Sequence, residues 1–119
     1  MITALSAVTL VVADMAKSTT FYESLGFERL YGGPTAGFTS YRAGASYLNL
    51  QLDQFSQAPA SWGRAIFYVD DVDVFHARAI EAGLRPEFEP RDAPWRERYF
   101  HIRDPDGHEI SFAKPLRSQ

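Results

Sequence analysis

Apolar residues occur along the chain in short segments that Gly, Pro and Asp separate. Residues 8–13 are apolar and rich in β-branched side chains, and Asp14 ends the run. Between residues 15 and 25, apolar or small residues recur at helical spacing, and Gly26 then provides a C-terminal stop. The pattern predicts a strand followed directly by an amphipathic helix.

The same pattern occurs again in the second half of the chain. Asp14 aligns with Asp71 and Gly26 with Gly83 at one offset of about 57 residues. Three further strands are predicted after each helix, at 27–32, 37–44 and 46–54 and then at 84–90, 96–104 and 108–115. We therefore expect a single domain, 1–119, made of two βαβββ modules at 1–56 and 64–119 with a linker at 57–63.

Composition narrows the class of protein. The chain has 119 residues, of which 45% are hydrophobic and 14% aromatic, so one domain with its own core is expected. No Cys is present, which excludes disulfides, thiolate metal sites and a Cys nucleophile. The 12 basic and 15 acidic residues form no run of one sign, which argues against nucleic acid as a partner. The N-terminal apolar run is shorter than the roughly 20 residues of a membrane span and has no basic leader, so we expect no membrane partner and a cytoplasmic protein.

Two motifs in the repeat carry a family resemblance. The paired βαβββ pattern with FYESLGF at 21–27 and FHIRDPDGHEISFAKPL at 100–116 resembles the vicinal oxygen chelate superfamily. That superfamily contains glyoxalase I, extradiol dioxygenases, fosfomycin resistance enzymes and bleomycin resistance proteins. The resemblance covers essentially the whole chain. It implies an α+β fold in which two βαβββ modules form an open barrel around a cup-shaped site, often within a homodimer.

The resemblance also implies where a metal would bind. Metal-dependent members hold His, Glu or Gln at up to four cup-facing positions, which align here with Ala7, Asn49, Arg64 and Ser111. Ala has no donor atom, Arg repels a cation, and Asn and Ser are weak neutral ligands. A shift of one residue selects side chains on the other face of each strand and does not supply a ligand. We therefore expect neither a metal nor another cofactor.

Strand parity from these positions predicts one apolar face and one mixed face. The apolar face should form the cores beneath the two helices. The mixed face should line the cup, or be filled by its own side chains and a dimer partner. Trp95 either stacks on a flat ligand or packs under its loop or at the dimer interface. Arg64, Arg91, Arg96 and Arg98 lie near the presumed mouth, which makes an anionic or neutral ligand as credible as a cationic one. The predicted ligand-binding residues are Tyr47, Asn49, Arg64, Tyr68, Trp95, Tyr99, His101 and Ser111.

The three histidines are expected to differ in role. His101 has cup-facing parity beside Tyr99, so His101 is the candidate general base and Tyr99 its candidate partner. The alternative is a strand histidine that only bonds across the sheet. We expect His108 to be a solvated turn residue and His76 to lie at the edge of the second helix.

Three functions remain open from the sequence. The leading one is metal-free binding of an aromatic or antibiotic-like compound at a dimer interface, similar to that of bleomycin resistance proteins. The second is an enzyme: a glyoxalase- or fosfomycin-type lyase or transferase with a displaced or non-standard metal site, or a metal-free enzyme that uses His101. The third is a dimerising or regulatory module whose cup is closed.

Overall fold

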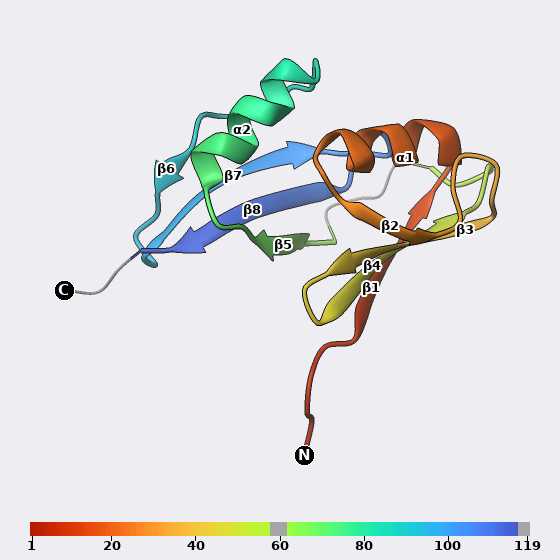
Figure 1. Cartoon of the computed structure of the whole chain (residues 1–119), viewed down its shortest axis with the longest axis horizontal. Coiled ribbons are helices and arrows are strands. Elements are labelled where there is room, and N and C mark those ends of the chain that lie inside the picture. The colour runs from red at the N-terminus through yellow and green to blue at the C-terminus, as the bar shows by residue number, and fades with distance from the viewer. Residues whose placement is uncertain (58–61, 117–119) are drawn as a thin grey trace. The chain divides into compact units, whose positions relative to one another are not determined.

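The computed structural model describes residues 1–57 and 62–116, and the chain divides into two compact units, Met1–Ala58 and Pro59–Gln119 (Figure 1). Each unit contains one helix and one four-stranded sheet. The α+β class and the two βαβββ modules predicted from the sequence are confirmed. The predicted linker 57–63 includes residues 58–61, which lie outside the described residues.

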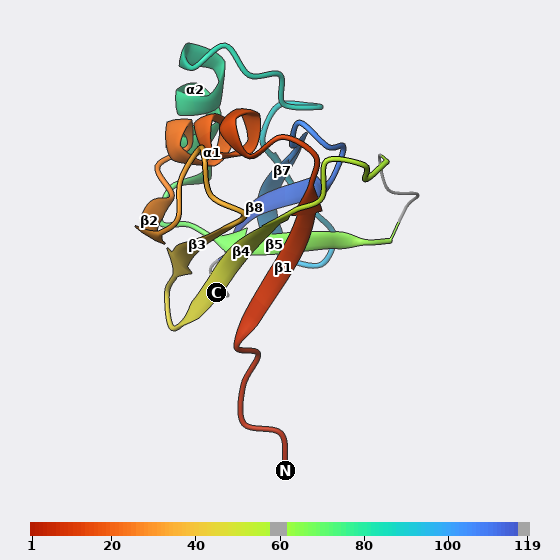
Figure 2. The same ribbon diagram turned by 90° about the vertical axis from the view of Figure 1, so that its right-hand side faces the viewer.

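The first unit forms its sheet in the order β1-β4-β3-β2, with β1 parallel to β4 and the other pairs antiparallel. Figure 2 shows α1 across one face of this sheet. The elements of the first unit are β1 (Ala7–Val12), α1 (Met15–Ser24), β2 (Glu28–Tyr31), β3 (Phe38–Ala43) and β4 (Ser46–Leu52).

The second unit repeats this topology in the order β5-β8-β7-β6, with β5 parallel to β8. The helix α2 lies over β7 and β8 (Figure 1). The elements of the second unit are β5 (Arg64–Tyr68), α2 (Val72–Glu81), β6 (Arg91–Asp92), β7 (Glu97–Arg103) and β8 (Glu109–Pro115).

The aspartates that end the first strand of each unit act as helix N-caps. The side chain of Asp14 accepts a hydrogen bond from the Lys17 N–H, and that of Asp71 accepts one from the Val74 N–H. At the other ends, Gly26 and Gly83 adopt φ values of 94° and 81°, which glycine reaches without steric cost. Each helix has 10 residues, and no helix of the described chain is long and apolar enough to cross a membrane.

The predicted apolar faces form the cores of the two units. In the second unit, Phe112 packs against Phe75 of α2 with ring centroids 5.2 Å apart and against Phe100 at 5.5 Å. Burying such rings against the helix is the main force that holds helix and sheet together. Other strand residues with the same parity are also buried: Leu10, Val12, Leu48, Leu50, Ala65, Ile102 and Ile110.

One predicted strand is absent. Residues 84–90 are irregular, and the short strand β6 follows them at Arg91–Asp92. Pro86 and Pro90 have no N–H to donate to a strand ladder, so this segment cannot pair along its length. It is tied to the sheet by a hydrogen bond from the Glu87 N–H to the His101 carbonyl.

Candidate functional site

The face of the second sheet that lies opposite α2 carries most of the predicted site. Residues paired directly across neighbouring strands point to the same side of a sheet. We call this side the open face. Its three rows are Tyr68, Ala113, Tyr99 and Arg91; Ile66, Ser111 and His101; and Arg64, Glu109 and Arg103.

A line of rings, here called the aromatic strip, occupies one side of the open face. It consists of Trp95, Tyr99, Phe88 and His101. The Tyr99 ring centroid lies 5.2 Å from Trp95, 5.4 Å from Phe88 and 5.5 Å from His101. The Phe88 and His101 centroids are 4.7 Å apart at an interplanar angle of 75°. These edge-on and tilted contacts fix the rings against one another while Trp95 stays 53% exposed.

Glu97 anchors one end of the strip. One oxygen of its carboxylate accepts a hydrogen bond from Trp95 Nε1 at 3.1 Å, and the other accepts a short hydrogen bond from the Tyr68 hydroxyl. The bond to Glu97 raises the pKa of Tyr68, so this phenol stays protonated. Tyr68 is nevertheless 65% exposed, and its ring remains open to contact.

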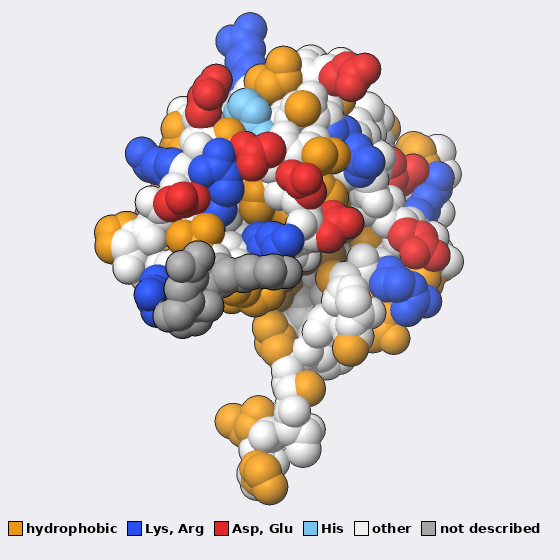
Figure 3. All heavy atoms as spheres, turned by 60° about the vertical axis from the view of Figure 1, so that its left-hand side comes forward, with side chains coloured by type: hydrophobic (Ala, Val, Ile, Leu, Met, Phe, Trp, Pro, Cys, Tyr) orange, Lys and Arg blue, Asp and Glu red, His pale blue; other side chains and the backbone are white. Residues whose placement is uncertain are grey.

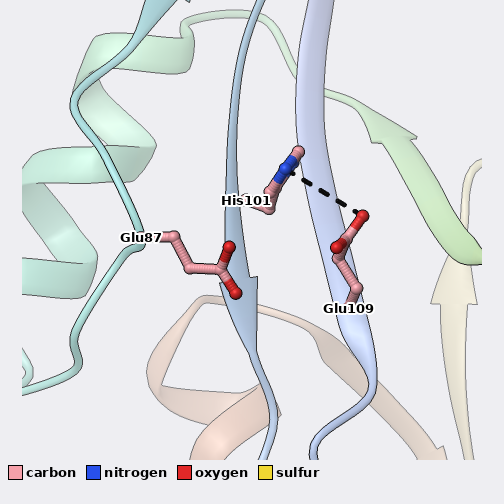
Figure 4. A group of neighbouring side chains, drawn as sticks. All are labelled: Glu87, His101 and Glu109. Carbon is pink, nitrogen blue, oxygen red and sulfur yellow. Dashed lines mark ion pairs between the residues drawn. The ribbon is translucent and has the colours of Figure 1, made fainter. Parts of the chain in front are cut away.

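A network of charges lies next to the strip. Figure 4 shows Glu87, His101 and Glu109 together, and His101 Nε2 lies 4.0 Å from a Glu109 oxygen. Two arginines neutralise the carboxylates: Arg64 contacts Glu109 at 3.3 Å, and Arg103 contacts Glu87 at 2.8 Å and Glu109 at 3.3 Å. Two carboxylates and two guanidiniums balance, so the network carries little net charge.

His101 is held in its neutral form. Burial is the main cause that lowers its pKa, and the positive charges of Arg64 and Arg91 act in the same direction. The carboxylates of Glu109 and Glu87 oppose this shift. The Nδ1 atom lies 3.2 Å from Ser111 Oγ, with which it shares a hydrogen bond. The arrangement gives the strip a neutral imidazole that can accept a proton.

Two predicted site residues belong to the first unit. Asn49 Oδ1 accepts a hydrogen bond from Ser40 Oγ at 2.7 Å, and its Nδ2 donates one to Thr9 Oγ1 at 3.3 Å. Tyr47 pairs with Ala7 of β1 and is 41% exposed. The structure therefore brings Arg64, Tyr68, Trp95, Tyr99, His101 and Ser111 together in the second unit, and it places Tyr47 and Asn49 in the first.

The four positions that hold a metal in metal-dependent members of the resembled superfamily do not fit one here. Ala7 has no donor, both polar groups of the Asn49 amide are hydrogen-bonded to neighbours, and the Arg64 cation is paired with Glu109. Ser111 is a buried neutral hydroxyl, only 2% exposed. A divalent ion requires several anionic or imidazole donors at one place, which these four residues do not supply.

A second group of potential ligands was not foreseen from the sequence. Glu87, His101 and Glu109 each offer one ligand atom, and these atoms lie within 4.8 Å of one another. The arginines already paired with both carboxylates would have to leave before a cation could enter. We therefore interpret this group as an ion-pair network around His101.

The sequence pattern did not identify three residues of the site: Glu87, Phe88 and Glu109. Glu109 has the same parity as Ser111, two residues away, so its place on the open face was readable from the strand pattern. Glu87 and Phe88 come from an irregular segment, for which no periodicity exists. The expectation for His108 was wrong: it is buried, and its Nδ1 accepts a hydrogen bond from Trp62 Nε1 at 3.1 Å.

Comparison with known families identifies the class of protein. Residues 4–112 match the model of the glyoxalase/bleomycin resistance protein/dioxygenase superfamily. Because the match covers most of the chain, the protein belongs to this superfamily. No curated protein matches the chain.

Solved structures share the fold at low sequence identity. The bleomycin resistance determinant encoded on transposon Tn5 is 22% identical, with a TM-score of 0.78 and coverage of 95% of this chain and 98% of that chain. A bleomycin-binding protein complexed with bleomycin is 22% identical, with a TM-score of 0.75 and the same two coverages. Lactoylglutathione lyase from Agrobacterium tumefaciens is 22% identical, with a TM-score of 0.74 and coverages of 96% and 95%. The fold therefore occurs both in a protein that binds bleomycin and in an enzyme.

Proposed function

We propose that this protein binds and sequesters a small aromatic compound on the open face of its second sheet, without a metal. The observation that carries the proposal is the aromatic strip, in which Trp95 and Tyr99 form a fixed pair of rings beside the neutral His101. A largely apolar surface with a few placed polar groups is the usual character of a small-molecule site. The proposal includes the homodimer that the family resemblance implies and the cytoplasmic location expected from the sequence.

Stacking supplies the expected binding energy. A planar ring placed on Trp95 or Tyr99 gains about 0.5–1.5 kcal/mol from ring contact beyond the area that it buries. A nearby hydrogen-bonding group, the exposed Tyr68 hydroxyl, would then orient the compound. An ion is unnecessary for binding of this kind, which fits the residues found at the family's metal positions.

Calorimetric titration with a neutral planar probe, 2-naphthylmethanol, tests the proposal, and bleomycin serves as a second probe because a related protein binds it. We expect Trp95→Leu to weaken binding of the naphthyl probe about 2- to 10-fold. Phe55→Leu is the matched control, since Phe55 is a highly exposed ring of the first unit. Failure of wild type to bind any aromatic probe, or equal effects of the two variants, would refute the proposed function.

A second candidate is an enzyme in which His101 acts as general base. The neutral imidazole between Ser111 and Glu109 favours it, because an unprotonated ring nitrogen can take a proton from a substrate. The structural likeness to a lactoylglutathione lyase suggests a first assay, the formation or breakdown of lactoylglutathione. Turnover that is present in wild type and lost in His101→Gln would favour the enzyme over the sequestering protein.

A further inference from the structure

One cation of the open face has no partner carboxylate. Arg91 lies on β6 opposite Tyr99 and is exposed. Its Cζ atom lies 3.7 Å from the centroid of the Phe88 ring and 5.6 Å from that of Tyr99. Within residues 1–57 and 62–116, no carboxylate lies within ion-pair distance of this guanidinium.

The other arginines on the strands of this sheet each contact a carboxylate. Arg64 pairs with Glu109, and Arg103 pairs with Glu87 and Glu109. Arg98 donates to both oxygens of Asp73 and to Asp92. Arg91, unlike the other arginines on these strands, contacts no carboxylate of the described residues. Its N–H groups are therefore available to an added anion.

The position of Arg91 is also restricted. A guanidinium placed over an aromatic ring has one side covered, and its N–H groups lie in its own plane, where an anion can reach them. Holding the group in this way reduces the side-chain entropy that is lost when a ligand binds. A fixed guanidinium fork matches the two oxygens of a carboxylate or the oxygens of a phosphate.

We propose that the compound bound by this protein is an aromatic acid, whose ring stacks on the aromatic strip and whose anionic group is bound by Arg91. This inference rests on the proposed function and specifies its ligand class. Ring and anion would be adjacent in the ligand, because Arg91 and Tyr99 are direct neighbours across the β6–β7 pair. The two carboxylates of the charge network are already neutralised, and both oxygens of Glu97 already accept hydrogen bonds.

The overall charge of the protein does not favour an anionic ligand. The net charge is −3, and side chains of both signs are interspersed over the face that Figure 3 shows. A preference for an anion must therefore come from a local group. That makes the effect of a single arginine measurable against a mildly unfavourable background.

The test compares three probes that share a ring and differ in charge: 2-naphthoate, 2-naphthylmethanol and 2-naphthylmethylammonium. We expect wild type to bind 2-naphthoate about 10-fold more tightly than 2-naphthylmethanol, and the ammonium most weakly. Arg91→Gln should remove the advantage of 2-naphthoate over 2-naphthylmethanol, so that the two probes bind with similar affinity. Arg91→Lys, which keeps the charge and loses the fork, should retain part of the advantage.

Arg85→Gln is the matched control, because it removes one exposed positive charge from the same unit. Equal loss of 2-naphthoate binding in Arg85→Gln and Arg91→Gln would overturn the inference, as would equal affinity of wild type for the anionic and neutral probes. In both cases binding of 2-naphthylmethanol would leave the proposed function standing. If no probe binds, the proposed function fails and the inference fails with it.

Discussion

His101 and Ser111 face each other across the antiparallel pair of β7 and β8, with Nδ1 and Oγ 3.2 Å apart. The sequence alignment with metal-dependent members of the superfamily predicts a ligand position at Ser111. Here its hydroxyl is instead used to hold an imidazole beside the aromatic strip. On its other side the ring faces Glu109, whose charge two arginines share. The relationship ties the position of the His101 ring to the hydroxyl of Ser111.

The lowered pKa of His101 predicts that acidification destabilises the fold. The unfolded chain, with an ordinary histidine pKa near 6.5, binds this proton more readily than the folded chain does. The free energy of unfolding should therefore fall as the pH drops below about 6.5 and stop falling below the folded-state pKa. Urea unfolding at about pH 7.5 and about pH 5.5 measures the effect.

His101→Gln should reduce this pH dependence, because the variant has no titrating group at the site. His76→Gln, which changes a histidine of α2, is the control. The cause assigned to His101 is wrong if wild type and His101→Gln lose the same stability between the two pH values. It is equally wrong if His76→Gln has the larger effect.

The two helix caps should contribute similar stability. Asp14 and Asp71 each accept a backbone hydrogen bond in the first turn, at 3.0 and 3.1 Å. Asp14→Ala and Asp71→Ala should each lower the free energy of unfolding by about 1 kcal/mol, since an N–H is left without its partner. Serine at either position keeps an acceptor, so the serine variants should retain most of the wild-type free energy of unfolding. Chemical denaturation that finds alanine and serine equally stable would contradict this role of the caps.

The turn between β7 and β8 depends on one carboxylate. Asp104 Oδ1 accepts hydrogen bonds from the backbone N–H of Asp106 at 3.0 Å and of His108 at 2.8 Å. Asp104→Ala leaves both donors without this acceptor, and we expect a loss of about 1–3 kcal/mol in unfolding free energy. Asp104→Asn keeps an oxygen at the same place and should cost less. A melting temperature of Asp104→Ala equal to that of wild type would show that the turn does not need the side chain.

Zinc should not stabilise the wild-type protein. The family positions lack suitable donors, and the Glu87–His101–Glu109 group is neutralised by Arg64 and Arg103. Protein purified without chelator should contain no stoichiometric metal, and added Zn²⁺ should leave its melting temperature unchanged.

The double variant Arg64→Gln/Arg103→Gln should gain a zinc-dependent rise in melting temperature, because its carboxylates are released. Adding His101→Ala to this double variant should abolish the rise. Zinc binding by wild type would contradict the interpretation of this group as an ion-pair network. A zinc response that survives His101→Ala would place the ion elsewhere.

Local sequence signals predicted the elements well where one physical cause dominates. The breaks between strand and helix at Asp14 and Asp71 and the helix stops at Gly26 and Gly83 lie where the pattern placed them, because capping and positive φ are properties of single residues. The buried faces agree with the predicted strand parity, because side chains alternate between the two faces of any strand. The pattern failed at 84–90, where prolines interrupt an otherwise strand-like composition, and at His108, whose burial depends on Trp62 46 residues away.

The sequence by itself determined the repeat, the class of fold, the absence of ligands at the family's metal positions and the face on which Tyr99, His101 and Ser111 lie. These properties depend on residue type and on the period of a strand, both of which are local. Only the tertiary structure decided the partners of those side chains. It brought Phe88 and Glu87 from an irregular loop against His101, and it paired most of the nearby arginines with carboxylates. Arg91 was left on its ring because long-range packing, which no local pattern encodes, sets which charges meet.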